Sequence, residues 1–275
     1  MGSFGNKMVA FSGKKLLLDT YGGARLAYSL RSLKGTTGSV VRVRRSSDNV
    51  EQDFNEKEIT NGTLLSFVGG GNGFVTIWYD QSGNGKNGTQ TLIDRQPRIV
   101  NNGVLVQDNG QPALSFDGVN DHFVTDESFT PNGYSFVVYN CAVDTFLIVL
   151  GCSAAPFRYL IRSPNGGGGH IYQYYANTLT LRNSNGTSLI NTQYITYIEK
   201  DHTSNTNLIR SNNDNSIVTN VTAPNGGVGN IRIGIEGPSS VSFNGTMQEI
   251  VIFGARQNLT LDAIMNNLNN KYNAF

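Results

Sequence analysis

The sequence predicts an all-β sandwich or barrel with a short helix near each end of the chain. Short runs of alternating apolar and polar residues follow one another from Val40 to Phe253, and Asn-Gly, Asp-Gly or Pro-Asn-Gly turns separate them. Glycine supplies 32 of the 275 residues and charged residues only 15%, which is typical of many strands joined by tight turns. The 14 Phe and 12 Tyr residues provide enough apolar volume for a sizeable core.

The chain is predicted to form one domain behind an N-terminal arm. Residues 1–15 are polar and contain glycine, so we expect an arm or linker there. Residues 16–275 are expected to form a single domain, because an all-β sandwich of this length can be one domain. Leu16–Leu18 is expected to begin its first strand.

Two helices are predicted, one near each end of the domain. In ARLAYSLRSL, residues 24–33, three leucines recur at i, i+4 and i+7, and Gly35 follows as a stop signal. Near the end of the chain Thr260 is a suitable N-cap. The residues after it place an apolar stripe on one helix face, formed by Leu261, Ile264, Met265, Leu268 and Tyr272.

Strands are expected between the two helices. Clear alternation marks the segments VVRVR, FVTIWYD, PALSFDG, YSFVVYN, HIYQYY, TLTLRN, QYITYIE, NIRIGIE and MQEIVIF. TFLIVLG, residues 145–151, is apolar throughout, which indicates a strand buried on both faces. After FVTIWYD, the turn DQSGNG combines glycines that accept positive φ with Asp80, whose carboxylate can bond nearby backbone. We therefore expect a rigid corner at residues 80–85.

Composition and charge exclude several classes of function. A formal net charge of +1 gives no overall field toward nucleic acid or an anionic membrane. No apolar run approaches the about 20 residues of a membrane span, and the N-terminus lacks the layout of a signal peptide, so we expect neither membrane insertion nor ordinary export. The three histidines are far apart, which argues against a histidine metal site. Cys141 and Cys152 are compatible with buried thiols or with one disulfide bridge.

Three segments carry a resemblance to known families. The run from AYSLRSL through GSVVRVRRSSDN to FVTIWYDQSGNG resembles the N-terminal part of the catalytic domain of family fifty-four α-L-arabinofuranosidases. QPALSFDGVNDHFV (111–124) and FNGTMQEIVIFGARQNLTLDAI (243–264) resemble the opening and closing hairpins of concanavalin A-like, laminin-G-like jelly rolls. Together they imply a concanavalin A-like β-sandwich over most of residues 16–272. Similar modules occur in bacteriophage tail, fibre and spike proteins, so the fold alone does not imply the enzyme.

The positions of the carboxyl groups argue against the enzyme activity. A retaining glycosidase needs two carboxyl groups about 5 Å apart. The resemblance implies an acid/base near Pro238 and a nucleophilic Glu in a central strand behind two adjacent cysteines. Here Cys152 is single, and no Asp or Glu occurs from Cys152 to Ile198. The remaining catalytic candidates are Glu236, for which strand alternation favours a solvated charge, and Glu249, for which the resemblance favours a structural role.

Two further groups of residues are candidate binding sites. Asp117 and Asp121 are candidate calcium ligands, although an Asx-turn is favoured because Ca²⁺ requires six to eight oxygens. A candidate carbohydrate-binding patch combines aromatic faces with polar groups beside a glycine loop. Its members are Arg158, Arg162, His170, Tyr172 and Tyr174. Edge-strand tyrosines or an oligomer contact would explain the same residues.

The sequence is interpreted as a non-catalytic, lectin-like module of a virus particle, such as a bacteriophage spike, fibre, capsid or tail component. Its expected partners are host cell-surface carbohydrate, other virion proteins and further copies of itself in a homo-oligomer. The expected location is the virion, and no cofactor is expected. Two alternatives stay open. One is a glycoside hydrolase of α-L-arabinofuranosidase type with relocated carboxylates, and the other is a purely structural virion protein.

Overall fold

The computed structural model describes residues 15–36, 38–128, 133–143, 147–152, 159–163, 171–174, 179–182, 190–201, 206–213, 217–220, 229–235, 242–254 and 261–275. The helices are α1 (Leu17–Thr20), α2 (Glu56–Thr60), α3 (Thr63–Val68) and α4 (Leu261–Tyr272), with a 3-10 turn η1 (Ile93–Arg95). The strands are, in order, β1 (Ala24–Ser29), β2 (Val41–Arg45), β3 (Glu51–Phe54), β4 (Gly73–Trp78), β5 (Gly88–Thr89), β6 (Arg98–Asn101), β7 (Val104–Leu105), β8 (Gln107–Asp108), β9 (Gln111–Pro112), β10 (Leu114–Asp117), β11 (Phe123–Ser128), β12 (Gly133–Cys141), β13 (Leu147–Ile148), β14 (Leu150–Cys152), β15 (Tyr159–Ser163), β16 (Ile171–Tyr174), β17 (Leu179–Arg182), β18 (Gln193–Asp201), β19 (Thr206–Ser211), β20 (Ile217–Asn220), β21 (Asn230–Ile233) and β22 (Asn244–Phe253).

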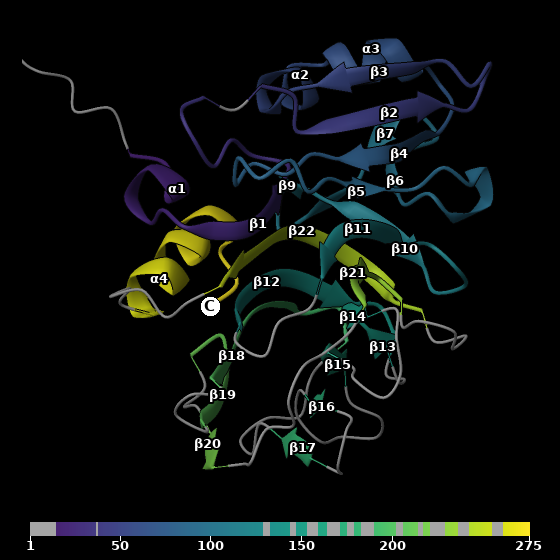
Figure 1. The fold of residues 1–275 in the computed structure, drawn as a ribbon. Coiled ribbons are helices and arrows are strands. Elements are labelled where there is room, and N and C mark those ends of the chain that lie inside the picture. Colours follow the sequence, from purple (N-terminus) through teal and green to yellow (C-terminus); the bar gives the residue numbers. More distant parts are fainter. Residues whose placement is uncertain are drawn as a thin grey trace, which may run out of the picture.

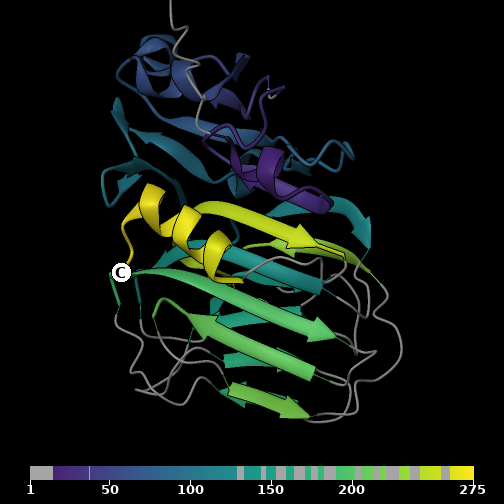
Figure 2. The same cartoon turned by 90° about the vertical axis from the view of Figure 1, so that its left-hand side faces the viewer.

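The fold is an antiparallel β-sandwich, which confirms the predicted fold class. The largest sheet follows the order β14-β21-β11-β5-β4-β6-β10-β22-β12-β18-β19-β20. Beside this path, β1 pairs with β22, β2 pairs with β3 and β4, and β7 pairs with β6. A second sheet, β13-β15-β16-β17, lies opposite β18–β20 in the lower part of Figure 1. Figure 2 shows helix α4, in yellow, lying against the face of the sheet that β22 forms with its neighbours β12 and β18.

Two hydrophobic cores hold the layers together. The inner core lies between the two halves of the long sheet, and Trp78, Phe123 and Ile233 from one half meet Val137 and Ile250 from the other. The outer core lies between the opposite face of this second half and the two end helices. Its members include Val251 and Ile195 from the strands, with Leu17, Leu268 and Tyr272 from α1 and α4. Strands β12, β18 and β22 are therefore buried on both faces.

The segment that was predicted as the first helix is strand β1. Leu26 and Tyr28 pair with Ile252 and Ile250 of β22 and enter the inner core, whereas Ala27 faces the outer core. A strand that is buried on both faces has no alternation of apolar and polar residues. The leucine spacing in this segment therefore matched the period of a helix. The short N-terminal helix is instead α1, formed by the residues after Leu16 where a strand was expected.

Helices α2 and α3 lie in a region where only strands were expected. A capping box begins α2, because the Asn55 side chain accepts the Glu58 N–H at 3.0 Å while the Glu58 carboxylate accepts the Asn55 N–H at 2.9 Å. Ile59 and Leu64 anchor this helical pair to the inner core. The sequence contained the Asn-x-x-Glu signal, but the surrounding strand pattern masked it.

The turn after β4 is the rigid corner that the sequence predicts. The Asp80 carboxylate accepts the Ala27 N–H at 2.9 Å and the Ser82 N–H at 3.0 Å. The Gln81 amide accepts the Leu33 N–H at 2.8 Å and donates to two carbonyls of the β1 segment at 3.0 Å each. These contacts attach the corner to β1. The turn DQSGNG, which resembles the arabinofuranosidase family, therefore has a structural role.

The remaining elements follow the predicted pattern with one break. The described part of TFLIVLG contributes β13 and β14, which belong to different sheets, and Val149 and Leu150 are buried. The C-terminal helix is α4, as predicted, while Thr260 lies outside the described residues. Residues 1–14 also lie outside them, so the arm and the single-domain organisation stay predictions. Within the described ranges, no helix is long and apolar enough to span a membrane.

Candidate functional site

The predicted carbohydrate patch falls mostly on residues that the structure does not describe. Arg158 and His170 lie outside the described residues. Arg162 is on β15, and Tyr172 and Tyr174 are on β16, which pairs with β15 in the second sheet. The backbone thus brings these two strands side by side, and the patch itself stays a prediction.

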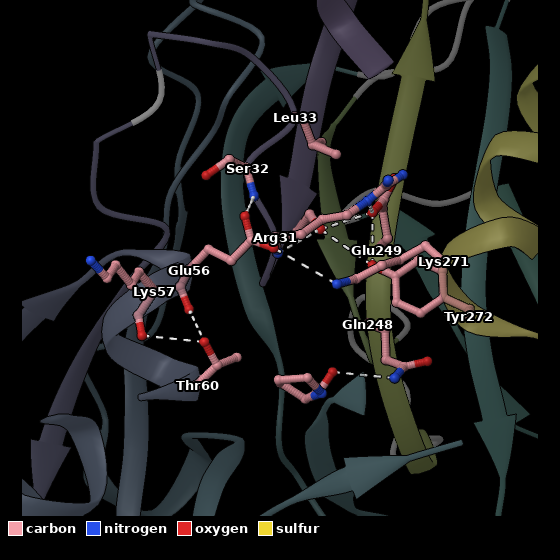
Figure 3. A network of polar contacts seen from close by, with 12 residues as sticks. Arg31, Ser32, Leu33, Glu56, Lys57, Thr60, Gln248, Glu249, Lys271 and Tyr272 are labelled. Atoms are coloured by element: carbon pink, nitrogen blue, oxygen red, sulfur yellow. Dashed lines mark hydrogen bonds and ion pairs between the residues drawn. The ribbon is translucent and has the colours of Figure 1, made fainter. Parts of the chain in front are cut away.

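Glu249, one of the two catalytic candidates, sits in a buried polar network (Figure 3). It is 1% exposed and projects from β22 toward the end of α4. Its Oε2 accepts hydrogen bonds from Arg31 Nε at 2.7 Å, Tyr272 at 2.8 Å and Ser29 at 2.8 Å, and its Oε1 accepts from Arg31 Nη2 at 3.0 Å. The bidentate ion pair and two hydroxyl donors use both oxygens, so Glu249 connects β22 with the segment after β1 and with α4.

The charges in this network support each other. Burial alone would lower the pKa of Arg31, but the charge and hydrogen bonds of Glu249 outweigh it and raise that pKa above its usual value. Burial, followed by the negative charge of Glu249, raises the pKa of the Tyr272 phenol. Arg31 therefore stays a cation and Tyr272 stays a hydrogen-bond donor at neutral pH.

Two hollows lie beside the network. The larger measures about 410 Å³ and is lined by Ser32, Gly38, Asn55, Glu56, Lys57 and Thr60. A narrow space of about 10 Å³, enough for one water, extends from Glu56 toward Arg31 and Tyr272. Glu56 accepts the Ser32 N–H at 2.8 Å and lies 3.7 Å from Lys271 Nζ (Figure 3). None of the described residues that line the larger hollow has an aromatic ring, so they offer no platform on which a sugar face would stack.

The turn between β10 and β11 brings two carboxyl groups into different environments. Asp117 is exposed, and its Oδ1 accepts the N–H groups of Val119 at 2.8 Å, Asn120 at 3.2 Å and Asp121 at 3.4 Å. This is the Asx-turn that the sequence favoured. Asp121 is only 7% exposed, and its Oδ2 accepts the Asp117 N–H at 3.0 Å.

Asp121 has the environment of a proton donor. Burial, followed by the charge of Asp117, raises the pKa of Asp121 to about 7, against the opposing effects of the Asp117 N–H and of Arg98. At neutral pH, Asp121 therefore carries a proton in about half of the protein molecules. Such a perturbed carboxyl is a candidate functional group.

The end of β21 packs against this turn. Gly234 has φ +88°, and a Cβ atom there would lie 3.0 Å from the Asp121 carbonyl oxygen and 2.7 Å from the Phe116 ring. Only glycine lets the chain pass so close. Glu236, the other catalytic candidate, follows two residues later and lies outside the described residues. Gly234, which packs against Asp121, is thus two residues before Glu236 in the sequence.

The same turn offers few ligands for a metal. Oδ1 of Asp117 already accepts three backbone N–H groups, and Oδ2 of Asp121 accepts a fourth. In the part of the chain that the structure describes, no group of three or more His, Cys, Asp or Glu side chains could hold a metal ion. Calcium would need most of its oxygens from elsewhere.

Comparisons with known proteins give solved structures of the same fold. No protein-family model matches the sequence, and no curated protein matches it. An arabinofuranosidase complexed with arabinofuranosyl-α-1,2-xylobiose matches with a TM-score of 0.69 and 18% identity, over 91% of this chain and 62% of that chain. A mutant GH54 α-L-arabinofuranosidase soaked with 4-nitrophenyl α-L-arabinofuranoside matches with a TM-score of 0.69 and 18% identity, over 89% of this chain and 62% of that chain. This chain spans less than two thirds of those enzymes, and the likeness shows the shared sandwich fold.

These matches correct the functional expectation. We expected a non-catalytic, lectin-like virion module, and that expectation is wrong, because the structures that share the fold over nine-tenths of the chain are glycoside hydrolases. Nothing in the comparisons points to bacteriophage, to a spike or to other virion partners. Carbohydrate-acting neighbours agree with the coarser expectation of a glycan ligand.

Proposed function

We propose that this protein is a glycoside hydrolase of the α-L-arabinofuranosidase type, with catalytic carboxyl groups at the β10–β11 turn and after β21. The observation that carries the proposal is the sandwich fold that this chain shares with an arabinofuranosidase complexed with an arabinofuranosyl ligand. The two structures match with a TM-score of 0.69 over 91% of this chain. The raised pKa of Asp121 is the second support.

Hydrolysis of a glycoside needs one carboxylic acid to protonate the leaving oxygen and a second carboxylate to act as nucleophile or base. No Asp or Glu occurs from Cys152 to Ile198, so the acids must come from other segments. Asp121 is suited to the acid role, because a pKa of about 7 leaves it protonated often enough to donate at neutral pH. Glu236 is the proposed second carboxylate, since it follows the glycine that packs against Asp121.

Two substrates with different leaving groups test the acid role of Asp121. A sugar hydroxyl leaves only when it is protonated, whereas 4-nitrophenolate leaves without a proton. Asp121→Asn should lower kcat/KM on arabinofuranosyl-α-1,2-xylobiose by about 10²- to 10⁴-fold, the usual contribution of a general acid. On 4-nitrophenyl α-L-arabinofuranoside the loss should be much smaller.

The matched control is Asp126→Asn, which removes an exposed carboxylate from the neighbouring strand β11. It should leave both rates unchanged. Equal losses on the two substrates in Asp121→Asn would exclude the acid role. A folded wild-type protein that hydrolyses neither substrate would exclude the proposed function, even if it bound them.

A further inference from the structure

The two hollows beside the Glu249 network meet and form one cleft, because Glu56 and Thr60 line both of them. The larger hollow, of about 410 Å³, is within the range of about 300 to 1,000 Å³ that is usual for small-ligand sites. The narrow hollow, of about 10 Å³, has room for one group of the size of a water molecule. A ligand that fills the cleft must therefore extend one small group from a larger body.

Three charged side chains, those of Glu56, Lys271 and Arg31, line the narrow hollow. Oε2 of Glu56 accepts the Ser32 N–H at 2.8 Å, whereas its Oε1 is 3.7 Å from Nζ of Lys271, which is too far for a hydrogen bond (Figure 3). An oxygen atom beside both groups can bridge such a separation. Arg31 donates to Glu249 through Nε and Nη2, and its Nη1 makes no hydrogen bond to any residue that the structure describes.

The charges around the cleft have both signs, which favours a neutral ligand. Lys57 and Glu56 line the larger hollow, and Lys271 faces Glu56 across the narrow one. An anion would therefore lie beside Glu56, and a cation would lie beside the two lysines. A hydroxyl group carries no charge and can donate one hydrogen bond while it accepts others, so it can bind Glu56 and Lys271 at once. The remaining described side chains of the larger hollow are short and polar, those of Ser32, Asn55 and Thr60.

We propose that this cleft binds a neutral polyhydroxylated ligand, such as a sugar unit, with one hydroxyl group between Glu56 and Lys271 and the body of the ligand in the larger hollow. The described lining of the larger hollow offers hydrogen bonds and no aromatic platform, so we expect affinity in the millimolar range. None of the described residues that line the cleft belongs to the β10–β11 turn. The site is therefore separate from Asp121, requires no hydrolysis and stands independently of the proposed activity.

The backbone amide of Ser32 reports on the cleft, because its N–H donates to Glu56. NMR of the full, nitrogen-labelled chain at fixed pH follows this signal during separate titrations with D-xylose, xylotriose and sodium acetate, with ionic strength held constant by NaCl. Saturable shifts are expected with both sugars and none with acetate. Tighter binding of xylotriose than of xylose would identify an oligosaccharide as the source of the ligand, and equal binding would identify a single sugar unit.

Variants of the two groups in the narrow hollow test their part in binding. Glu56→Gln and Lys271→Met should each weaken sugar binding about tenfold, because each removes a hydrogen bond that involves a charged group. Glu56→Gln retains an oxygen that can accept the Ser32 N–H, so the reporter signal is kept. Lys86→Met is the matched control, because Lys86 lines neither hollow and its Nζ lies 3.4 Å from the Asp126 carbonyl oxygen. It should bind as the wild type does.

Asp121→Asn separates this site from the proposed activity, since it should slow hydrolysis and leave the Ser32 titration unchanged. The proposal is overturned if neither sugar shifts the Ser32 signal, which would mean that the cleft holds only solvent. It is also overturned if acetate shifts the signal as much as the sugars do, or if Lys86→Met weakens binding as much as Lys271→Met.

Discussion

The ion pair between Arg31 and Glu249 gives the sharpest stability prediction. The Glu249 side chain is 1% exposed and that of Arg31 is 13% exposed. Removal of one member of a buried pair leaves an uncompensated charge and costs about 3 to 5 kcal/mol, whereas replacement of both by apolar residues of similar volume is often close to neutral. Arg31→Met and Glu249→Leu should therefore each lower the free energy of unfolding by about 3 to 5 kcal/mol. The double variant should cost far less than their sum.

Urea unfolding at pH 7 measures the free energies of unfolding of the two single variants and the double variant. The signal is the fluorescence of Trp78, which is the single tryptophan and is buried. A coupling energy of about 2 kcal/mol or more is expected for a pair in direct contact. The control cycle uses Arg42→Met and Asp53→Leu, whose side chains are 39% and 38% exposed, and should give a coupling of at most about 1 kcal/mol. Additive single variants at Arg31 and Glu249 would refute the reasoning that the ion pair joins β22 to the segment after β1.

Three further predictions concern the corner, the tight turn and the pH dependence. Gln81→Leu leaves one N–H and two carbonyls of the β1 segment without partners and should cost about 3 kcal/mol in urea unfolding; a loss below about 1 kcal/mol would contradict this role. Gly245→Ala places a Cβ 2.0 Å from the Asn140 carbonyl oxygen and should cost more than about 2 kcal/mol, whereas Gly133→Ala, which meets no atom within 4 Å, should change stability by less than about 1 kcal/mol. Because the pKa of Asp121 is raised to about 7, the folded state binds more protons than the unfolded state between about pH 4 and 7. Stability contributed by this group should therefore fall as the pH rises through that window, and Asp121→Asn should flatten the fall; an unchanged pH profile would contradict the assignment.

The sequence predicted the sandwich because most of its strands have one apolar face, and it failed where burial removes that signal. Strand β1 is covered on both faces by the two cores, so its leucines matched a helical spacing as well as a strand. Helix α2 was missed although Asn55 and Glu58 form a capping-box signal, because five helical residues give almost no periodicity.

The candidate site was less predictable than the fold. Asp117 was interpreted correctly as a turn residue from FDGVND alone, since Asx-turns are local. The raised pKa of Asp121 depends first on burial, and no local pattern encodes which strands bury this side chain.

The most direct measurement of the proposed activity is product analysis of arabinofuranosyl-α-1,2-xylobiose by proton NMR. The wild-type protein should convert it to free arabinose and xylobiose, and Asp121→Asn should slow that conversion by about 10²-fold or more. An unchanged substrate spectrum after prolonged incubation with folded wild-type protein would contradict the assignment as a glycoside hydrolase.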